Sequence, residues 1–61
     1  MLEGLRFKVV DERSPEYGQT IVIEYVDEAY VYYLKEDGEH GQTSIAHVMH
    51  RINEGIWELV K

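Results

Sequence analysis

Three histidines are the residues in this sequence whose types and spacing come nearest to a metal site. His47 and His50 stand three positions apart, on one face of an expected helix, and His40 precedes them. Neutral imidazole is a common ligand for zinc and nickel. The face that the two helical histidines share is the polar one, and no acidic residue stands at a suitable third position. We therefore expect surface histidines, with no metal and no other cofactor.

Catalytic chemistry has little support in the sequence. Ser44 and His47 would have to act as nucleophile and base, but Ser44 is better placed to cap a helix. The chain has no cysteine nucleophile and no glycine loop followed by the lysine that binds phosphate. A chain of 61 residues also has little interior in which to hold a preorganised pocket. We predict that the protein is not an enzyme.

Tyrosines give the clearest indication of a binding surface. Residues 30–34 read Tyr-Val-Tyr-Tyr-Leu, so neither face of the strand expected there is polar, and a chain this small cannot bury both faces. Tyrosine suits protein interfaces because it combines a large apolar ring with a polar tip. Tyr25 and Trp57 are expected in the core. The predicted contact surface consists of Tyr17 with either Tyr30 and Tyr32 or Tyr33, and alternation does not decide between the two faces.

Acidic residues outnumber basic residues by twelve to six, which gives a net charge of −6. This charge disfavours direct binding to a nucleic-acid backbone. The acids could form one face that imitates nucleic-acid phosphates, or they could simply solvate three loops. The candidate acidic face consists of Asp11, Glu12, Glu16, Asp27, Glu28, Glu36, Asp37 and Glu39.

The sequence predicts that the elements positioning these residues are mainly short strands. Apolar residues alternate with polar ones at the period of a strand, and β-branched and aromatic residues are frequent. Pro15 and Gly18 mark a loop in residues 11–18. In the second strand, Ile21, Ile23 and Tyr25 are expected on one face. The expected strands are residues 5–11, 20–26, 29–35, 39–43 and 56–60.

Turn and helix signals connect these strands. Asp27-Glu28 is expected to form a tight polar connection, and Asp37-Gly38 predicts a type I′ turn. Thr43 or Ser44 is expected to cap a helix of about two turns, and Gly55 to end it. The apolar face of this helix is expected to consist of Ile45, Val48, Met49 and Ile52. In the last strand, Trp57 and Leu59 are expected to point inward.

Five short antiparallel strands with one short helix before the last strand predict a mainly β, single-domain barrel spanning residues 1–61. The segment FKVVDERSPEYGQTIVIEYVDEAYVYYL resembles SH3-like barrels of the KOW type, with Val9-Val10 as the strand and Gly18 as the turn glycine. The segment SIAHVMHRINEGIWELVK is similar to the helical turn and last strand that complete such barrels. The chain departs from the KOW pattern at Ile21, where a second glycine is common, and it lacks the basic residues that KOW modules use on RNA. In size and pattern it also resembles small SH3-like proteins of phages and prophages.

These features predict a non-catalytic domain that binds another protein, or a second copy of itself, through an exposed aromatic and acidic surface. An acidic inhibitor that imitates nucleic acid is the first alternative, and a KOW-like RNA-binding module is the second. The N-terminal sequence MLEGLRFKVV lacks the apolar core of a signal peptide, and no apolar run approaches the roughly 20 residues of a membrane helix. We expect a soluble, cytoplasmic protein.

Overall fold

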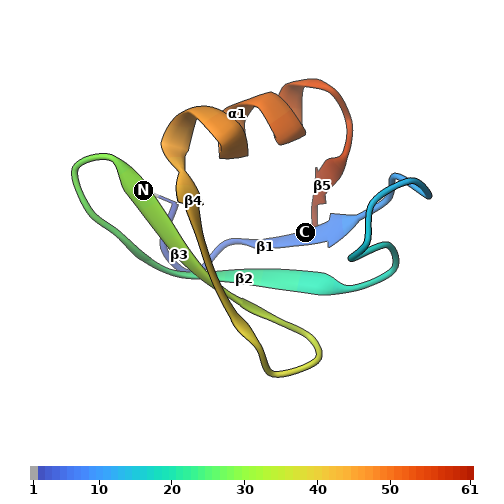
Figure 1. The fold of residues 1–61 in the computed structure, drawn as a ribbon, viewed down its shortest axis with the longest axis horizontal. Helices are drawn as coiled ribbons and strands as arrows, with labels where there is room; N and C mark the ends of the chain where they lie inside the picture. The colour runs from blue at the N-terminus through green and yellow to red at the C-terminus, as the bar shows by residue number, and fades with distance from the viewer. Residues whose placement is uncertain (1) are drawn as a thin grey trace.

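The protein forms a single antiparallel sheet with one helix across it. The computed structural model describes residues 2–61, and the sheet order is β4-β3-β2-β1-β5. The predicted mainly β class, with five strands and one short helix before the last strand, is confirmed (Figure 1). The elements are β1 (Arg6–Val9), β2 (Thr20–Val26), β3 (Tyr30–Lys35), β4 (His40–Ser44), α1 (Ile45–Asn53) and β5 (Trp57–Leu59).

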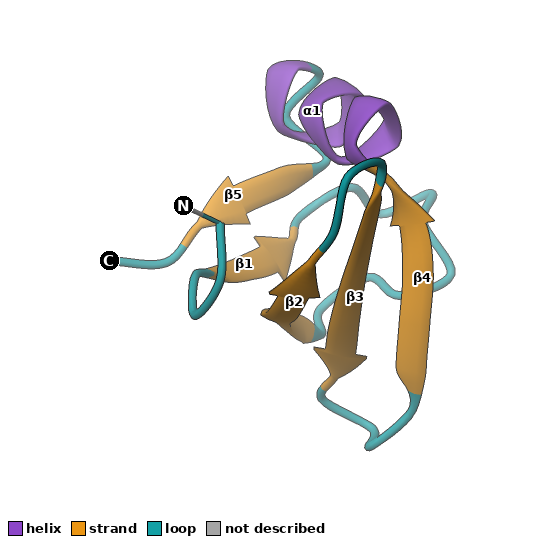
Figure 2. Ribbon diagram, turned by 90° about the vertical axis from the view of Figure 1, so that its left-hand side faces the viewer, coloured by secondary structure: helices purple, strands orange, loops and turns teal. Residues whose placement is uncertain are grey.

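Helix α1 occupies the open side of the curved sheet. Strands β4 and β5 are the two edges, and within residues 2–61 no ladder joins them to each other. The helix follows β4 directly, leads back to β5 and contacts β3, β4 and β5 (Figure 2). The chain thereby covers its core without pairing its two sheet edges. Of the residues that the structure describes, none belongs to a helix long and apolar enough to cross a membrane.

Alternation along β1 and the first half of β2 places the core on one face of the sheet. Phe7 and Val9 of β1 face inward, and Ile21 and Ile23 of β2 lie beside them. Trp57 is 4% exposed, as predicted for a core residue, and its ring centroid lies 5.7 Å from that of Phe7. The buried core consists of Phe7, Val9, Ile21, Ile23, Val31, Val48 and Trp57.

Gly41 in β4 leaves room for an aromatic side chain of β3. It pairs across the sheet with Tyr33, and a Cβ atom at position 41 would collide with the Tyr33 ring. The Tyr33 ring can therefore occupy the space beside Gly41 and meet Trp57 edge-on, with centroids 5.6 Å apart and planes at 80°. Glycine usually weakens a strand, but at this position it is what allows Tyr33 to pack on the core.

Both ends of α1 are capped as the sequence predicts. Of the two candidate N-caps, Ser44 serves: its Oγ accepts a hydrogen bond from His47 N–H at 3.1 Å. At the other end, Gly55 has φ of 74°, a conformation that side chains with a Cβ rarely adopt. Gly55 N–H donates to the Ile52 carbonyl at 3.2 Å and Ile56 N–H to the Arg51 carbonyl at 2.8 Å, which is a Schellman cap.

Two residues expected inside lie outside. Met49 is 44% exposed, because successive helical positions are about 100° apart and Val48 occupies the centre of the face that α1 turns toward the sheet. Leu59 is also 44% exposed; it lies on the edge strand β5, whose neighbour within the described sheet is β1. The prediction that both contribute to the core is therefore wrong.

The connection between β3 and β4 is tight but differs from the predicted type I′ turn. Gly38 N–H donates to the Lys35 carbonyl at 2.9 Å, and Lys35 N–H donates to the Glu39 carbonyl at 2.8 Å. A type I′ turn requires positive φ at both central residues. Among the residues described, positive φ occurs only at glycines, and here only Gly38 has it, at 91°. The connection is a three-residue loop in which Gly38 alone takes the left-handed conformation.

Candidate functional site

A bulge in β2 changes which side chains reach the outer face of the sheet. The pairing runs from Ile21↔Lys35 to Ile23↔Tyr33 and resumes at Tyr25↔Tyr32, so Glu24 is not opposite any residue of β3. The extra residue reverses the alternation. Tyr25 consequently points outward and is 57% exposed, while Val26 turns inward and packs against the core. The prediction that Tyr25 belongs to the core is wrong for this reason.

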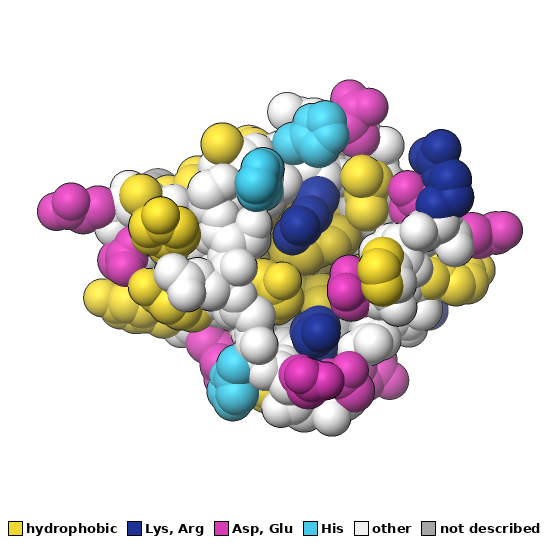
Figure 3. Space-filling view, viewed as in Figure 1, with side chains coloured by type: hydrophobic (Ala, Val, Ile, Leu, Met, Phe, Trp, Pro, Cys, Tyr) yellow, Lys and Arg dark blue, Asp and Glu magenta, His cyan; other side chains and the backbone are white. Residues whose placement is uncertain are grey.

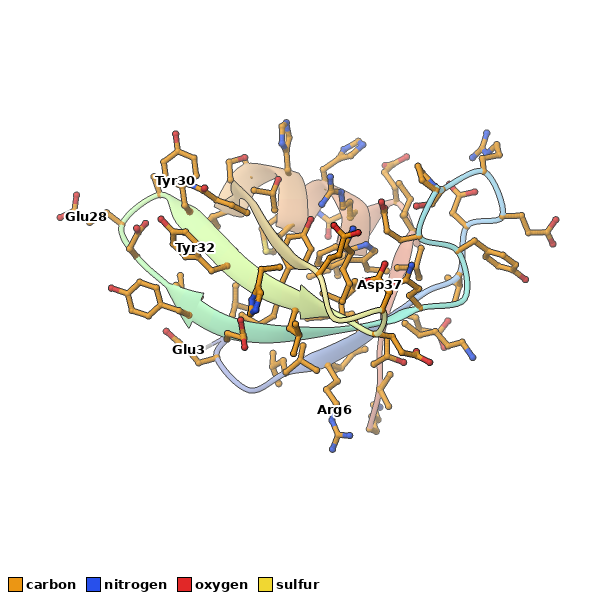
Figure 4. All side chains as sticks on the ribbon, turned by 60° about the horizontal axis from the view of Figure 1, so that its bottom comes forward. Glu3, Arg6, Glu28, Tyr30, Tyr32 and Asp37 are labelled. Carbon is orange, nitrogen blue, oxygen red and sulfur yellow. The ribbon has the colours of Figure 1, made fainter. Side chains whose placement is uncertain are left out.

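The bulge brings three tyrosines together on the outer face of the β2–β3 hairpin. The ring centroids of Tyr25 and Tyr32 are 5.6 Å apart with planes tilted by 36°, and Tyr30 follows at the hairpin end with 46% of its surface exposed. Figure 4 shows Tyr30, Tyr32 and Glu28 gathered at this end of the molecule. We refer to Tyr25, Tyr30 and Tyr32 as the tyrosine patch.

Asp27 organises the turn beneath the tyrosine patch. Its Oδ1 accepts hydrogen bonds from Tyr30 N–H at 3.0 Å and Ala29 N–H at 3.2 Å, and its Oδ2 accepts one from the Tyr32 hydroxyl at 3.2 Å. These bonds, with the two backbone donors contributing most, lower the pKa of Asp27. Partial desolvation and the Asp27 carboxylate raise the pKa of Tyr32. The carboxylate is therefore charged at neutral pH, and the Tyr32 ring is held in place by its hydroxyl.

An open hollow of about 590 Å³ lies at the hairpin end. Its lining residues include two exposed tyrosines and both acidic residues of the turn. Aromatic faces carry partial negative charge, and the carboxylates carry full negative charge. The hollow therefore offers apolar contact area and a negative potential at the same place. It is lined by Tyr25, Asp27, Glu28, Ala29 and Tyr30.

The structure separates the tyrosines that the sequence grouped together. Tyr33 lies on the inner face of β3 and packs on the core, so Tyr30 and Tyr32 are the tyrosines that β3 presents outward. Tyr17 is 54% exposed, but it belongs to the loop that leads into the start of β2. A seven-residue strand spans about 20 Å, and the tyrosine patch is at its other end. Tyr17 is therefore not part of the tyrosine patch.

The acidic residues also form two groups and not one face. Thr20 N–H donates to Glu36 Oε1 at 2.9 Å and Asp37 N–H to Gln19 Oε1 at 3.4 Å, which ties the β3–β4 turn to the β1–β2 loop. Asp27 and Glu28 lie at the opposite end of β2, and Figure 3 shows acidic side chains at both ends of the molecule. The six acids at the loop end are Asp11, Glu12, Glu16, Glu36, Asp37 and Glu39.

Several of these carboxylates accept hydrogen bonds from donors in their own loops. Asp11 accepts hydrogen bonds from the backbone N–H of Arg13 at 2.9 Å and from its Nε at 3.2 Å, and these bonds lower the pKa of Asp11. Asp37 accepts one from Glu39 N–H at 2.9 Å. Aspartate is common in turns because its side chain satisfies backbone donors in this way. Part of the acidic composition is thus explained by turn formation.

The histidines do not come together. His40 Nδ1 lies 3.0 Å from Glu24 Oε1, across the sheet from α1, and His47 Nδ1 lies 3.3 Å from the Thr43 hydroxyl at the start of the helix. Within residues 2–61 no group of three histidine, cysteine or acidic side chains is arranged to hold a metal ion.

A second open hollow, of about 480 Å³, lies on the outer face at the other end of the sheet. Val22 and Leu34 pair across β2 and β3 to form its apolar floor, and Arg6 pairs with Val22 from β1. Arg6 points away from the sheet on this side (Figure 4). The outer face thus carries apolar side chains along much of its length.

Sequence reasoning identified Tyr30 and Tyr32 as candidates but missed Tyr25. The inward positions of β2 are Ile21, Ile23 and Val26, and the spacing of three between the last two is the sequence signal of the bulge.

No family model matches the chain, and no curated protein or solved structure shows significant similarity to it.

Proposed function

We propose that this chain is a non-catalytic protein-binding domain whose contact surface is the tyrosine patch together with Asp27 and Glu28. The observation that carries the proposal is that the exposed residues Tyr25 and Tyr30 line one hollow at the hairpin end, together with the two acidic residues of the turn. Tyrosines in such clusters contribute much of the binding energy in protein interfaces.

Two further features support the proposal, one in the tyrosine patch and one in the fold. The bond from the Tyr32 hydroxyl to Asp27 fixes one ring of the tyrosine patch before any partner arrives, which reduces the entropy lost on binding. The sheet order, with β1 between β2 and β5 and a helix before β5, supports the proposed kinship with SH3-like barrels. In such domains the fold is a scaffold, and function depends on the surface residues that it presents.

A capture experiment with a matched control tests this proposal. Immobilised wild-type protein, the double variant Tyr25→Ala/Tyr30→Ala and the control Tyr17→Ala would be exposed to the same lysate of the source organism. We expect a specific partner to be retained by wild type and Tyr17→Ala and lost by the double variant. Sedimentation velocity on the three proteins shows whether that partner is a second copy. Equal retention by all three proteins would refute the tyrosine patch as the contact surface.

An inhibitor that imitates nucleic acid is the second candidate. The bonds that tie Glu36 to Thr20 and Gln19 to Asp37 favour it, because they gather six carboxylates at the loop end. Such a partner would be a DNA-binding protein, and its capture would fall steeply with salt and with added duplex DNA. The double variant Glu12→Gln/Glu36→Gln would weaken this capture, whereas Tyr25→Ala/Tyr30→Ala would leave it unchanged.

A further inference from the structure

We propose that the hollow of the tyrosine patch receives an arginine side chain from the partner, so that the partner binds through an arginine-bearing segment. The inference rests on the proposed function and specifies its ligand. Tyr25 and Tyr30 line the hollow with Asp27 and Glu28, and the neighbouring Ala29 leaves it open. Cations are attracted to the faces of tyrosine rings and to carboxylates, and here one hollow presents both.

The negative groups of the hollow have no cationic partner of their own. Within residues 2–61 no lysine, arginine or histidine forms an ion pair with Asp27 or Glu28. At the loop end, by contrast, the carboxylate of Asp11 is already paired with Arg13. A cation from outside would therefore meet uncompensated charge at the hairpin end, and the net charge of −6 would favour its approach.

Arginine fits this arrangement better than lysine. A guanidinium group is planar, stacks on aromatic faces, is less strongly hydrated than an ammonium group and can donate two hydrogen bonds to one carboxylate. Glu28 is exposed and makes no hydrogen bond within the described chain, so both of its oxygens are available. Asp27 uses Oδ1 for the turn and shares Oδ2 with Tyr32, so it contributes charge from a fixed position.

A titration followed by NMR tests the inference on the intact chain. The probes are three nine-residue peptides of alternating glycine and serine whose central residue is arginine, lysine or citrulline, added at 150 mM NaCl. Citrulline keeps the shape of arginine but has no charge. We expect the amide signals of residues 25–32 to shift most, and arginine to bind about fivefold more tightly than citrulline.

Variants of exposed residues locate the site. Glu28→Gln and Tyr30→Ala should each weaken binding of the arginine peptide about threefold or more. Glu12→Gln and Tyr17→Ala remove an exposed acid and an exposed tyrosine from the other end of the molecule, and they should leave the affinity unchanged. The amide spectrum of each variant without peptide shows that the fold is intact.

Three results would overturn the inference: citrulline or lysine binding as tightly as arginine, shifts centred on residues 11–18 and 36–39, or equal affinity in all four variants. Failure of the proposed function is a separate result. If Tyr25→Ala/Tyr30→Ala loses its captured partner while the peptides show no preference for arginine, the tyrosine patch remains the contact surface and the arginine inference is wrong.

Discussion

A single carboxylate connects the turn, the aromatic surface and the charge at the hairpin end. Asp27 satisfies two backbone donors of the turn and holds the Tyr32 hydroxyl, while its charge faces the hollow. Each of these bonds favours the ionised form, so the pKa of Asp27 is lowered in the folded protein. A group of this kind makes folding depend on pH.

Acid should therefore weaken the folded state in part through Asp27. A lowered pKa means that this stabilisation is fully present above the unfolded pKa of about 4 and is lost as the pH falls through the folded pKa. Asp27→Asn keeps an oxygen that can accept the turn bonds but does not titrate. We expect the urea midpoint of wild type to fall more steeply below about pH 4 than that of Asp27→Asn.

Trp57 fluorescence during urea unfolding at a series of pH values measures both midpoints, because Trp57 is the only tryptophan and is buried. Asp11 also has a lowered pKa, so the variant should keep part of the acid dependence. If the urea midpoints of the two proteins fell in parallel with pH, Asp27 would contribute nothing to the acid dependence of stability. Because the pKa of Tyr32 is raised in the folded protein, the contribution of the protonated Tyr32 hydroxyl to stability is lost as the pH rises through that pKa.

At the level of single elements, the bulge in β2 decides the composition of both faces. Ile23 is opposite Tyr33 and Tyr25 is opposite Tyr32, which leaves Glu24 as the extra residue. Without a bulge, strict alternation would turn Tyr25 inward and Val26 outward. With it, the core keeps Val26 and the surface gains Tyr25.

Deletions in β2 should therefore have unequal effects. Removing Glu24 leaves Ile21, Ile23 and Val26 on the inner face in regular alternation, so the protein should fold with a loss of about 1 kcal/mol or less. Removing Val22 brings Ile21 and Ile23 next to each other, which forces one of them outward, and this variant should be unfolded. Dispersion of the amide NMR signals distinguishes the two outcomes, and equal damage from both deletions would contradict the role assigned to Glu24.

The whole molecule is a small sheet whose open side is covered by one helix of nine residues. A chain of this size has a total stability of about 3–9 kcal/mol. Val48 is the helical side chain that is fully buried, and Ile45 and Ile52 pack beside it. The attachment of α1 to the sheet thus depends on few side chains.

Truncating Val48 should therefore cause a large loss of stability. Val48→Ala removes two methyl groups from a closed core and should cost about 2 kcal/mol in the free energy of unfolding. Met49→Ala is the matched control on the same helix; Met49 is 44% exposed, and its loss should cost less than about 0.5 kcal/mol. Urea unfolding gives both values, and equal losses would mean that the helix packs differently from the structure described.

Local patterns in the sequence were enough to determine the strands, the loop at residues 11–18, the capped helix and most of the core. Alternation, capping residues and turn glycines act over a few neighbouring positions, so Ser44, Gly55 and the inward sets of β1 and β2 as far as Ile23 follow from them. The presence of more aromatic surface than a 61-residue chain can bury was also evident from composition.

Only the tertiary structure decided which aromatic residues form the exposed surface. The choice between Tyr33 and the pair Tyr30 and Tyr32 depends on Gly41, which lies on another strand and makes space for the Tyr33 ring. The position of Tyr25 depends on a shift of register between β2 and β3. The separation of Tyr17 from the tyrosine patch follows from the direction of β2. Each of these is a relation between residues that are distant in sequence, and alternation along one strand carries no information about its neighbours.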